Sequence, residues 1–304
     1  MMDKQSRVRS KCILGGGAAL GFAHIGALKA LESGYEINAI LGTSMGAIIG
    51  ALYACSYSPE EIRQIAKEKE FKRFIRLNLN ILKEGVLNTR KMYDFFLQIT
   101  RNAKIEESQI KYASVAFDLN HKRTVIIDKG LFADAMMASS NLPFLNQAYP
   151  YKGTLLVDGG VCYPFPLEFS HLFSDQLTCI AVNVLPHLLK EPVFLEESDV
   201  PGQDFPVNNL IYNSMIVNLY NQANLAVDSL HHVKPDIYVN CFTEQLKAWD
   251  FNKVDEFYDS GYHQTLQILN LSPARHSTIL DEIRQNTRQL LNKIKKDFSH
   301  RLRS

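Results

Sequence analysis

Short apolar runs alternate with stretches of helical periodicity over the first sixty residues. The runs 11–14 (KCIL) and 37–41 (INAIL) are brief and bounded by polar or glycine-rich segments, as expected for buried strands. After each run, residues 18–33 and 45–56 place apolar side chains at helical spacing. The pattern therefore predicts a β-α-β-α unit in which each strand passes through a tight turn into a helix.

The same alternation continues through most of the chain. Ser58, followed by Pro59 and two glutamates, is a helix start signal. Further strands are predicted at 112–119, 123–128, 154–158, 176–185 and 236–240, and further helices at 207–230 and 253–269. Short apolar strands alternating with helices are typical of a parallel sheet covered on both faces. The sequence thus predicts an α/β fold with three α/β/α layers, a mainly parallel central sheet and a C-terminal helical extension.

Composition divides the chain into three expected parts: a basic N-terminal arm at 1–11, one domain at 12–270, and a basic amphipathic helix at 271–304. Within the domain, residues 189–206 carry three prolines and five acidic residues, which predicts an exposed loop or a flap near a site. The last helix could lie on a membrane surface, or it could pack on its own domain or on a second copy of the chain. A homo-oligomer is therefore one of the alternatives.

Charge and cysteine usage narrow the classes of function. The formal net charge of +1 lacks the basic footprint of a nucleic-acid-binding protein, so no nucleic acid partner is expected. The cysteines are dispersed and form no C-x-x-C pair, which argues against a disulfide framework and against a zinc site. A reducing, cytoplasmic compartment is the simplest interpretation. The five cysteines are Cys12, Cys55, Cys162, Cys179 and Cys241.

Two kinds of motif are absent from the sequence. No stretch of about 20 predominantly apolar residues runs without polar or glycine interruptions, so no membrane span is expected. There is also no H-E-x-x-H motif, no Cys/His cluster and no acidic calcium loop. Neither a metal nor another cofactor is therefore expected.

Ser44 lies in the pattern G-x-S-x-G, between Gly42 and Gly46, where the second predicted strand becomes a helix. Glycines on both sides allow a strained turn that exposes a serine hydroxyl at the start of a helix. Serine becomes a nucleophile only when a base takes its proton and an oxyanion is stabilised. The alternative is a glycine-rich turn in which the serine merely caps the helix.

The segment 15–21 (GGGAALG) also follows a strand and opens a helix. Its spacing does not match the dinucleotide fingerprint, because Ala18 stands where G-x-G-x-x-G requires its second glycine, and no P-loop Lys-Ser/Thr pair follows. A series of backbone N–H groups directed at one point could instead serve as an oxyanion hole. Both turns belong to one β-α-β-α unit, so their strand ends should lie side by side, which favours a catalytic interpretation.

Asp158 ends an apolar strand and is followed by Gly159 and Gly160. A carboxylate at this edge of the sheet could reach Ser44, although an aspartate that caps a turn is the plainer interpretation of Asp-Gly. Chain order alone also permits a Ser-Asp-His triad with one of the later histidines. These candidates are His171, His231 and His263.

Together these motifs resemble the patatin-like phospholipase family of serine acyl-lipid hydrolases, in its bacterial form. The resemblance covers residues 12 to about 270 and rests on GFAHIGALKALE, GTSMGAIIGALYA, ASSNLPFLNQAY, VDGGVCYPFPLE and FNKVDEFYDSGY. It implies that Ser44 is the nucleophile and Asp158 its general base, without a histidine. It also implies an oxyanion hole formed by the backbone N–H groups of Gly16, Gly17 and Ala18, with Gly21 as a further motif glycine.

The sequence departs from the family pattern at two positions. Leu20 stands where the family has Arg or Lys, and Ala18 replaces a glycine, which bears on the strength of the activity more than on its type. The resemblance predicts a phospholipase A-type lipid acyl hydrolase that acts on phospholipids or related acyl lipids. Peripheral contact with the inner membrane surface is expected as well. The alternatives are an acyltransferase or thioesterase that uses the same serine, and a regulatory protein with weak or lost catalysis.

Overall fold

The computed structural model describes most of the predicted domain. The described residues are 7–69, 71, 85–143, 147–186 and 210–270. The predicted loop 189–206 and the predicted C-terminal helix 271–304 lie outside the described residues, as do the first six residues of the predicted basic arm.

Eight strands form one sheet in the order β5-β6-β3-β2-β1-β7-β8, with β4 paired to β3. The central pairs β1–β2, β1–β7, β2–β3 and β7–β8 are parallel, whereas β4, β5 and β6 pair antiparallel. The predicted mainly parallel sheet is therefore confirmed. The strands are β1 Val8–Leu14, β2 Tyr35–Thr43, β3 Lys111–Asp118, β4 Arg123–Ile127, β5 Tyr149–Tyr151, β6 Thr154–Asp158, β7 Thr178–Asn183 and β8 Ile237–Asn240.

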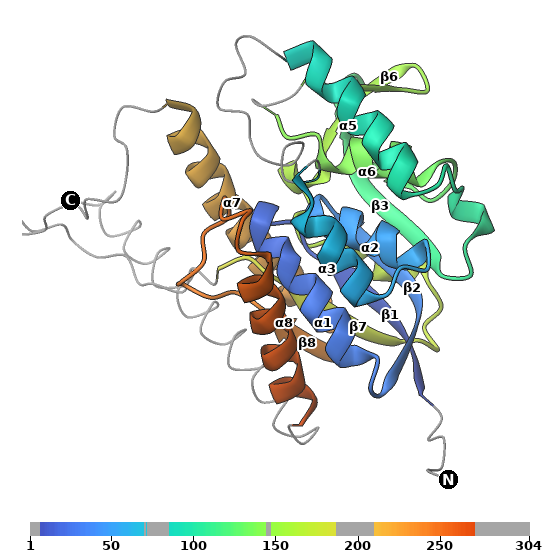
Figure 1. Ribbon diagram of the computed structural model, residues 1–304, viewed down its shortest axis with the longest axis vertical. Helices are drawn as coiled ribbons and strands as arrows, with labels where there is room; N and C mark the ends of the chain where they lie inside the picture. The colour runs from blue at the N-terminus through green and yellow to red at the C-terminus, as the bar shows by residue number, and fades with distance from the viewer. Residues whose placement is uncertain (1–6, 70, 72–84, 144–146, 187–209, 271–304) are drawn as a thin grey trace, which may run out of the picture.

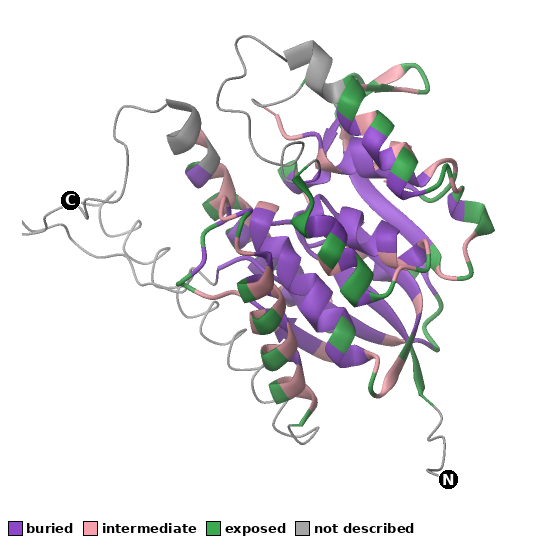
Figure 2. Cartoon of the chain, viewed as in Figure 1, coloured by how far each residue is buried: buried purple, intermediate pink, exposed green. Residues whose placement is uncertain are grey.

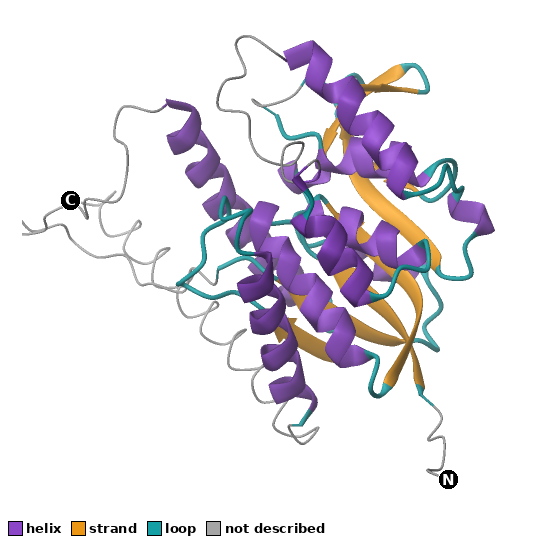
Figure 3. Ribbon diagram, viewed as in Figure 1, coloured by secondary structure: helices purple, strands orange, loops and turns teal. Residues whose placement is uncertain are grey.

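Helices connect most of these strands (Figures 1 and 3). The α-helices are α1 Ala23–Leu31, α2 Met45–Ala54, α3 Pro59–Lys67, α5 Gly85–Ile99, α6 Phe132–Ser140, α7 Leu210–His232 and α8 Val254–Leu269. Short 3-10 helices are η1 Ala18–Phe22, η2 Ile105–Glu107, η3 Gly159–Val161 and η4 Leu167–Leu172.

Side chains on β1 show that the sheet is covered on both faces. Successive side chains of a strand point to opposite faces. Leu14 faces α2, where its Cδ1 lies 3.5 Å from the Cβ that an alanine at position 50 would carry. Lys11 points the other way, and its Nζ donates hydrogen bonds of 3.0 and 3.3 Å to the carbonyls of Ser170 and Phe173, in and just after η4. Layers on both sides of β1 agree with the predicted α/β/α arrangement.

The structure shifts several predicted boundaries. β1 begins at Val8, so the end of the predicted basic arm is part of the sheet, and Lys11 is buried. The predicted helix 18–33 is the 3-10 helix η1 followed by α1, because Ala18 starts it with a φ of +50° that an α-helix does not use. The three-residue strand β5 was not predicted, since it is too short to show periodicity.

Helices α1 and α8 cross with their backbones in contact (Figure 1). A Cβ added at Gly26 of α1 would lie 1.9 Å from the Tyr258 carbonyl oxygen of α8. A Cβ added at Gly261 of α8 would lie 1.9 Å from the Ala23 carbonyl oxygen of α1. Only a residue without a Cβ permits this approach. The crossing therefore fixes α8 directly against the helix that follows the glycine-rich turn.

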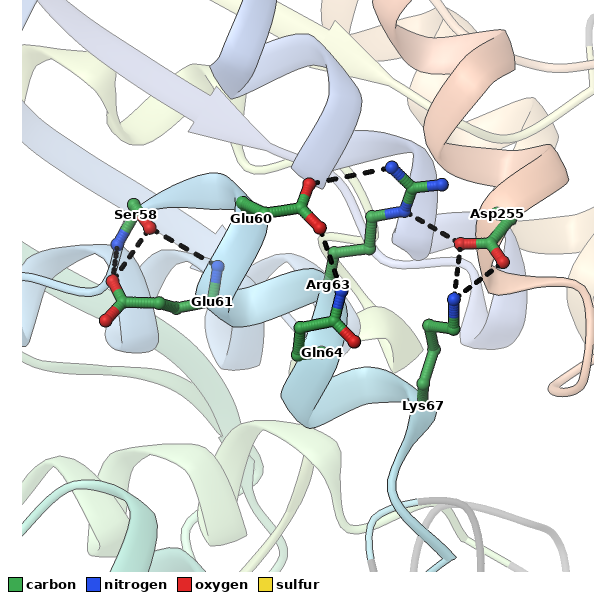
Figure 4. A network of polar contacts seen from close by, with 7 residues as sticks. All are labelled: Ser58, Glu60, Glu61, Arg63, Gln64, Lys67 and Asp255. Carbon is green, nitrogen blue, oxygen red and sulfur yellow. Dashed lines mark hydrogen bonds and ion pairs between the residues drawn. The ribbon is translucent and has the colours of Figure 1, made fainter.

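Helix α3 starts as predicted and is tied to α8. Ser58 and Glu61 form a capping box, in which the Glu61 amide donates to Ser58 Oγ and the Ser58 amide donates to the Glu61 carboxylate. Arg63 Nε and Lys67 Nζ approach the Asp255 carboxylate of α8 at 2.7 and 2.8 Å (Figure 4). These groups are partly exposed, so each ion pair contributes at most about 1 kcal/mol.

The core runs along the sheet and the inner sides of its helices. Figure 2 shows α1 almost wholly buried, whereas the outer sides of α3 and α8 carry the exposed residues. Within the described part of the chain, no helix is both long and apolar enough to cross a membrane. The same described residues contain no group of three or more His, Cys, Asp or Glu side chains placed to hold a metal ion.

Candidate active site

β2, which ends one residue before Ser44, and β6, which ends at Asp158, meet on β3. In the register of the sheet, Thr43 of β2 pairs with Val115 and Asp158 of β6 pairs with Ala116. Because β4 occupies the other edge of β3 at both positions, β2 and β6 share one edge and approach from opposite directions. Ser44 and Asp158 therefore come together across neighbouring residues of β3, although 114 positions separate them in the sequence.

Ser44 and Asp158 are joined directly. The Ser44 Oγ–H donates a hydrogen bond of 2.5 Å to Asp158 Oδ2. Ser44 is 8% exposed and Asp158 is 1% exposed, so the contact is almost shielded from water. Ser44 has φ +54° and ψ −122°, a conformation that costs a non-glycine residue about 1–3 kcal/mol. It is the last residue before α2, where the first N–H groups of a helix favour negative charge.

Burial raises the pKa of the Asp158 carboxyl to about 6, because the ionised form loses its hydration. The hydrogen bonds from Ser44 and from the Gly160 amide act in the opposite direction and limit the rise. The Gly160 amide donates to Asp158 Oδ1 at 2.7 Å, so this oxygen caps the turn while Oδ2 contacts Ser44. The Asp158 side chain therefore both caps its turn and contacts Ser44, the two possibilities that the sequence left open.

The glycines around Ser44 let α2 reach the ends of two strands. A Cβ at Gly46 would lie 2.3 and 2.6 Å from the carbonyl oxygens of Leu14 and Gly15. A Cβ at Gly42 would lie 2.5 Å from the Ala47 amide nitrogen. Since these neighbours are backbone atoms, they cannot move aside as a side chain would. The G-x-S-x-G turn thus brings the nucleophile candidate against the glycine-rich turn, as the sequence predicted.

The three amides expected in an oxyanion hole differ in their hydrogen bonding. The Gly16 amide donates to the Pro164 carbonyl at 2.7 Å. Because it already has a partner, it is not the free oxyanion donor that the sequence resemblance implied. Within the described chain, the amides of Gly17 and Ala18 make no hydrogen bond. Pro164 lies in the segment that follows Asp158. This hydrogen bond therefore ties that segment to the glycine-rich turn.

His24 supports the glycine-rich turn through a hydrogen bond to its backbone and is not part of a triad. Its Nε2 lies 2.7 Å from the Gly15 carbonyl oxygen, and the side chain has no exposed surface. Burial lowers the pKa of His24 to about 4, so the ring is neutral and donates to that carbonyl. Within the described chain, neither Ser44 nor Asp158 is hydrogen-bonded to a histidine.

Leu20, which the sequence resemblance places at the family's cationic position, is 2% exposed and belongs to the core. We expect Leu20→Arg to destabilise the fold by about 3 kcal/mol or more, because a guanidinium would be buried among apolar residues. It should not raise the rate of ester hydrolysis. Thermal unfolding measures the effect, with Leu20→Met as the control of conserved volume, expected to lose less than about 1.5 kcal/mol. A Leu20→Arg variant as stable as the Met variant would contradict this account.

Sequence reasoning missed the part played by the end of α6. Ser139 and Asn141 contact the backbones of Ser44 and Asp158, respectively. The residue types of their segment (ASSNLPFLNQAY) carry no catalytic pattern, and the sequence marks the segment only through its resemblance to the family. The supporting glycines Gly159 and Gly160 form η3, directly after Asp158.

Comparison with known proteins agrees with this arrangement. A family model described as patatin-like phospholipase matches residues 12–170, more than half of the chain. The chain belongs to the patatin-like phospholipase family. The matched range contains the glycine-rich turn, the Ser44 turn, the end of α6 and Asp158.

Individual patatin-like relatives share part of their length with this chain. An "uncharacterized NTE family protein" of Mycobacterium tuberculosis is 35% identical over 181 residues, which is 59% of this chain and 50% of the relative. Human "patatin-like phospholipase domain-containing protein 6" is 27% identical over 282 residues, 82% of this chain and 19% of the relative. "Lysophospholipase NTE1" of Meyerozyma guilliermondii is 30% identical over 273 residues, which is 82% of this chain and 18% of the relative. The chain thus spans half or less of the length of these relatives.

A solved structure shows a more distant likeness. VipD from Legionella pneumophila aligns with a TM-score of 0.47 at 13% identity, covering 86% of this chain and 66% of that protein.

Proposed function

We propose that this protein is a serine lipid acyl hydrolase of the phospholipase A type, a carboxylic ester hydrolase with a Ser44–Asp158 dyad. The observation that carries the proposal is the 2.5 Å hydrogen bond from Ser44 Oγ to a buried carboxylate, made on a strained turn at a helix start. Membership of the patatin-like phospholipase family supports the lipid substrate. The name lysophospholipase, borne by a relative, suggests lysophospholipids as the first substrates to try.

In the first step, Ser44 Oγ attacks the ester carbonyl carbon while its proton passes to Asp158 Oδ2. A carboxylate with a pKa of about 6 is a better proton acceptor than an ordinary aspartate, whose pKa is about 4. Burial therefore makes Asp158 a more effective base. The carbonyl oxygen becomes an oxyanion, for which the free amides of Gly17 and Ala18 are the proposed donors. Each such donor is worth about 3 kcal/mol in the transition state.

The tetrahedral intermediate then collapses and the bond to the alcohol breaks. Asp158 returns its proton to the leaving glycerol alkoxide, and the acyl group stays on Ser44. The alcohol that departs is a lysophospholipid from a phospholipid substrate and a glycerophosphodiester from a lysophospholipid. Water attacks this acyl-enzyme as Asp158 accepts its proton. The fatty acid leaves as the Ser44–acyl bond breaks, and Ser44 Oγ recovers a proton from Asp158.

Peripheral membrane contact is part of the same proposal. Val161 follows the Asp158 turn and is 39% exposed. Val217 and Tyr220 of α7 are 59% and 42% exposed, and Gln222 of the same helix lies against Gly160. Large apolar side chains on the turn and helix beside the dyad suit a substrate that is drawn from a bilayer. We place the enzyme in the cytoplasm, at the inner membrane surface.

The test combines covalent labelling with a lipid screen. A fluorophosphonate probe should label the wild-type protein, and mass spectrometry should locate the adduct on Ser44. Lysophosphatidylcholine and phosphatidylcholine, presented as micelles and vesicles, should release fatty acid. Absence of both labelling and release would overturn the proposal in favour of a non-catalytic regulator. Transfer of the acyl group to added glycerol, in place of fatty acid release, would favour an acyltransferase.

A further inference from the structure

We propose that Ser139 is a positioning residue for the nucleophile, and that Ser139 and Asn141 together form a clamp at the end of α6 that holds both residues of the dyad. The inference rests on the proposed function, because it assigns the clamp a role in the reaction of Ser44. Ser139 and Asn141 are both fully buried, so their role is positioning and not contact with the substrate.

A single hydroxyl links Ser44 to the central strand. The Ser44 amide donates a hydrogen bond of 2.9 Å to Ser139 Oγ. The Ser139 hydroxyl in turn donates one of 2.6 Å to the carbonyl of Val115 on β3. Ser139 has no exposed surface, so water does not compete for either contact. Both hydrogen-bonding functions of this side chain are thus occupied by backbone groups.

The hydroxyl lies where the sheet is interrupted. β2 ends at Thr43, opposite Val115, and β6 ends at Asp158, opposite Ala116. At this junction Ser44 leaves the strand with a φ of +54°, and its amide donates to Ser139 Oγ. Ser139 then connects that amide to β3 through its side chain. The strained backbone of Ser44 is held by this bridge, because buried N–H and C=O groups require partners.

The same helix end holds the second member of the dyad. The Asp158 amide donates to the Asn141 carbonyl at 3.0 Å, just beyond the last residue of α6. Asn141 is itself fixed, since its Nδ2 donates to the Gln147 carbonyl at 2.5 Å and its side chain is fully buried. Two residues of one helix end therefore set the backbones that carry Ser44 Oγ and Asp158 Oδ2.

Loss of the Ser139 hydroxyl should change the chemistry more than the binding. In Ser139→Ala, the Ser44 amide and the Val115 carbonyl both lose a buried partner, and the Ser44 backbone can relax toward a common conformation. A shift of about 1 Å in a reacting group can cost about 100-fold in rate. We expect the maximal rate of fluorophosphonate inactivation (kinact) to fall by about 10- to 100-fold. The probe's half-saturating concentration (KI) should stay within about threefold of the wild-type value.

Ser140→Ala is the matched control. Ser140 is the neighbouring residue of the same helix, and its Oγ donates at 2.7 Å to the Met136 carbonyl within α6, away from the dyad. This variant removes the same atoms from the same helix turn, so it should keep wild-type kinact and KI. Both variants are compared with wild type at a temperature well below their unfolding midpoints. The pH at which inactivation is half-maximal should not move, because Asp158 is intact in all three proteins.

The outcomes separate the two proposals. A wild-type protein that is never labelled refutes the proposed function, whereas labelling of wild type and Ser139→Ala at equal rates refutes only the clamp. Equal losses in Ser139→Ala and Ser140→Ala would also refute it, since they would reflect general damage to α6. If Ser139→Ala does not fold, Ser139→Cys provides the test with Ser140→Cys as its control. The weaker thiol hydrogen bonds should lower kinact only at position 139.

Discussion

Replacing Asp158 with asparagine is expected to lower kcat for ester hydrolysis by about 1,000- to 10,000-fold. The amide keeps the shape of the carboxyl group and can still accept the Gly160 N–H, but it cannot take a proton from Ser44. Within the described chain, no histidine is hydrogen-bonded to the dyad, so none of the described histidines is in place to act as a second base. Fatty acid release by purified wild-type and variant protein measures the loss, and near-wild-type activity of Asp158→Asn would rule out this base.

The wild-type pH profile should report the same carboxyl group. Asp158 must be ionised to accept a proton, and burial raises its pKa to about 6. The rate should therefore be constant above about pH 7 and fall about tenfold per pH unit below pH 6. A limb near pH 6 would usually be assigned to a histidine, but the pKa of the buried His24 is lowered to about 4. A limb near pH 4 would show that Asp158 is not desolvated as the structure indicates.

Asp158→Asn should also stabilise the fold at neutral pH. A carboxyl whose pKa rises from about 3.9 to about 6 on folding favours the folded state below pH 4, and this contribution is lost as pH rises through 6. At pH 8 the ionised form costs at most about 3 kcal/mol, which the neutral amide avoids. The variant should therefore unfold at a higher temperature than wild type at pH 8, with the difference vanishing near pH 4.

Asp118→Asn is the control, because it is expected to change the stability of the fold in the opposite direction. Asp118 is also a buried carboxylate at the end of a strand, but it caps the β3–β4 turn. Burial acts to raise its pKa, yet hydrogen bonds from Thr154 and His121 outweigh this and hold the pKa well below the usual range. Its ionised form thus stabilises the fold above about pH 4. The asparagine variant should lose stability at pH 8 while kcat stays within a few-fold of wild type.

The sequence was informative wherever a local rule determines local structure. Capping chemistry around Ser58 located the start of α3, and the glycines at 42 and 46 located the turn that carries Ser44. Two turns that follow neighbouring parallel strands must lie at one edge of the sheet, so their proximity could be derived without coordinates. Approximate element boundaries followed from apolar periodicity for the same reason.

The approach of Asp158 depended on pairing that no local rule reveals. β6 reaches Ser44 because it runs antiparallel along β3 and stops where β2 stops, a register set by contacts between distant segments. The occupied Gly16 amide is a similar case, since its partner Pro164 is remote in sequence. Helix α6 carries small and apolar residues on most of its surface, so it lacks the polar face that marks a helix in sequence. Ser139 therefore gave no recognisable signal.

Gly261→Ala is expected to destabilise the protein by about 3 kcal/mol or more, although alanine is the better helix former by about 1 kcal/mol. The new Cβ would lie 1.9 Å from the Ala23 carbonyl oxygen, so α8 and α1 would have to separate by more than 1 Å. Thermal unfolding should show a midpoint lower by about 5–10 °C. Gln267→Ala, on the exposed side of the same helix, should leave the midpoint within about 2 °C of wild type.

The same substitution should impair catalysis through the oxyanion turn. α1 continues directly from η1, which begins at Ala18, so moving α1 displaces the amides proposed to hold the oxyanion. Fluorophosphonate labelling well below the unfolding midpoint should be slower in Gly261→Ala than in Gln267→Ala, even where both proteins are folded. A midpoint equal to or above that of wild type would show that α1 and α8 are not in backbone contact. The role of α8 in supporting the turn would then be refuted as well.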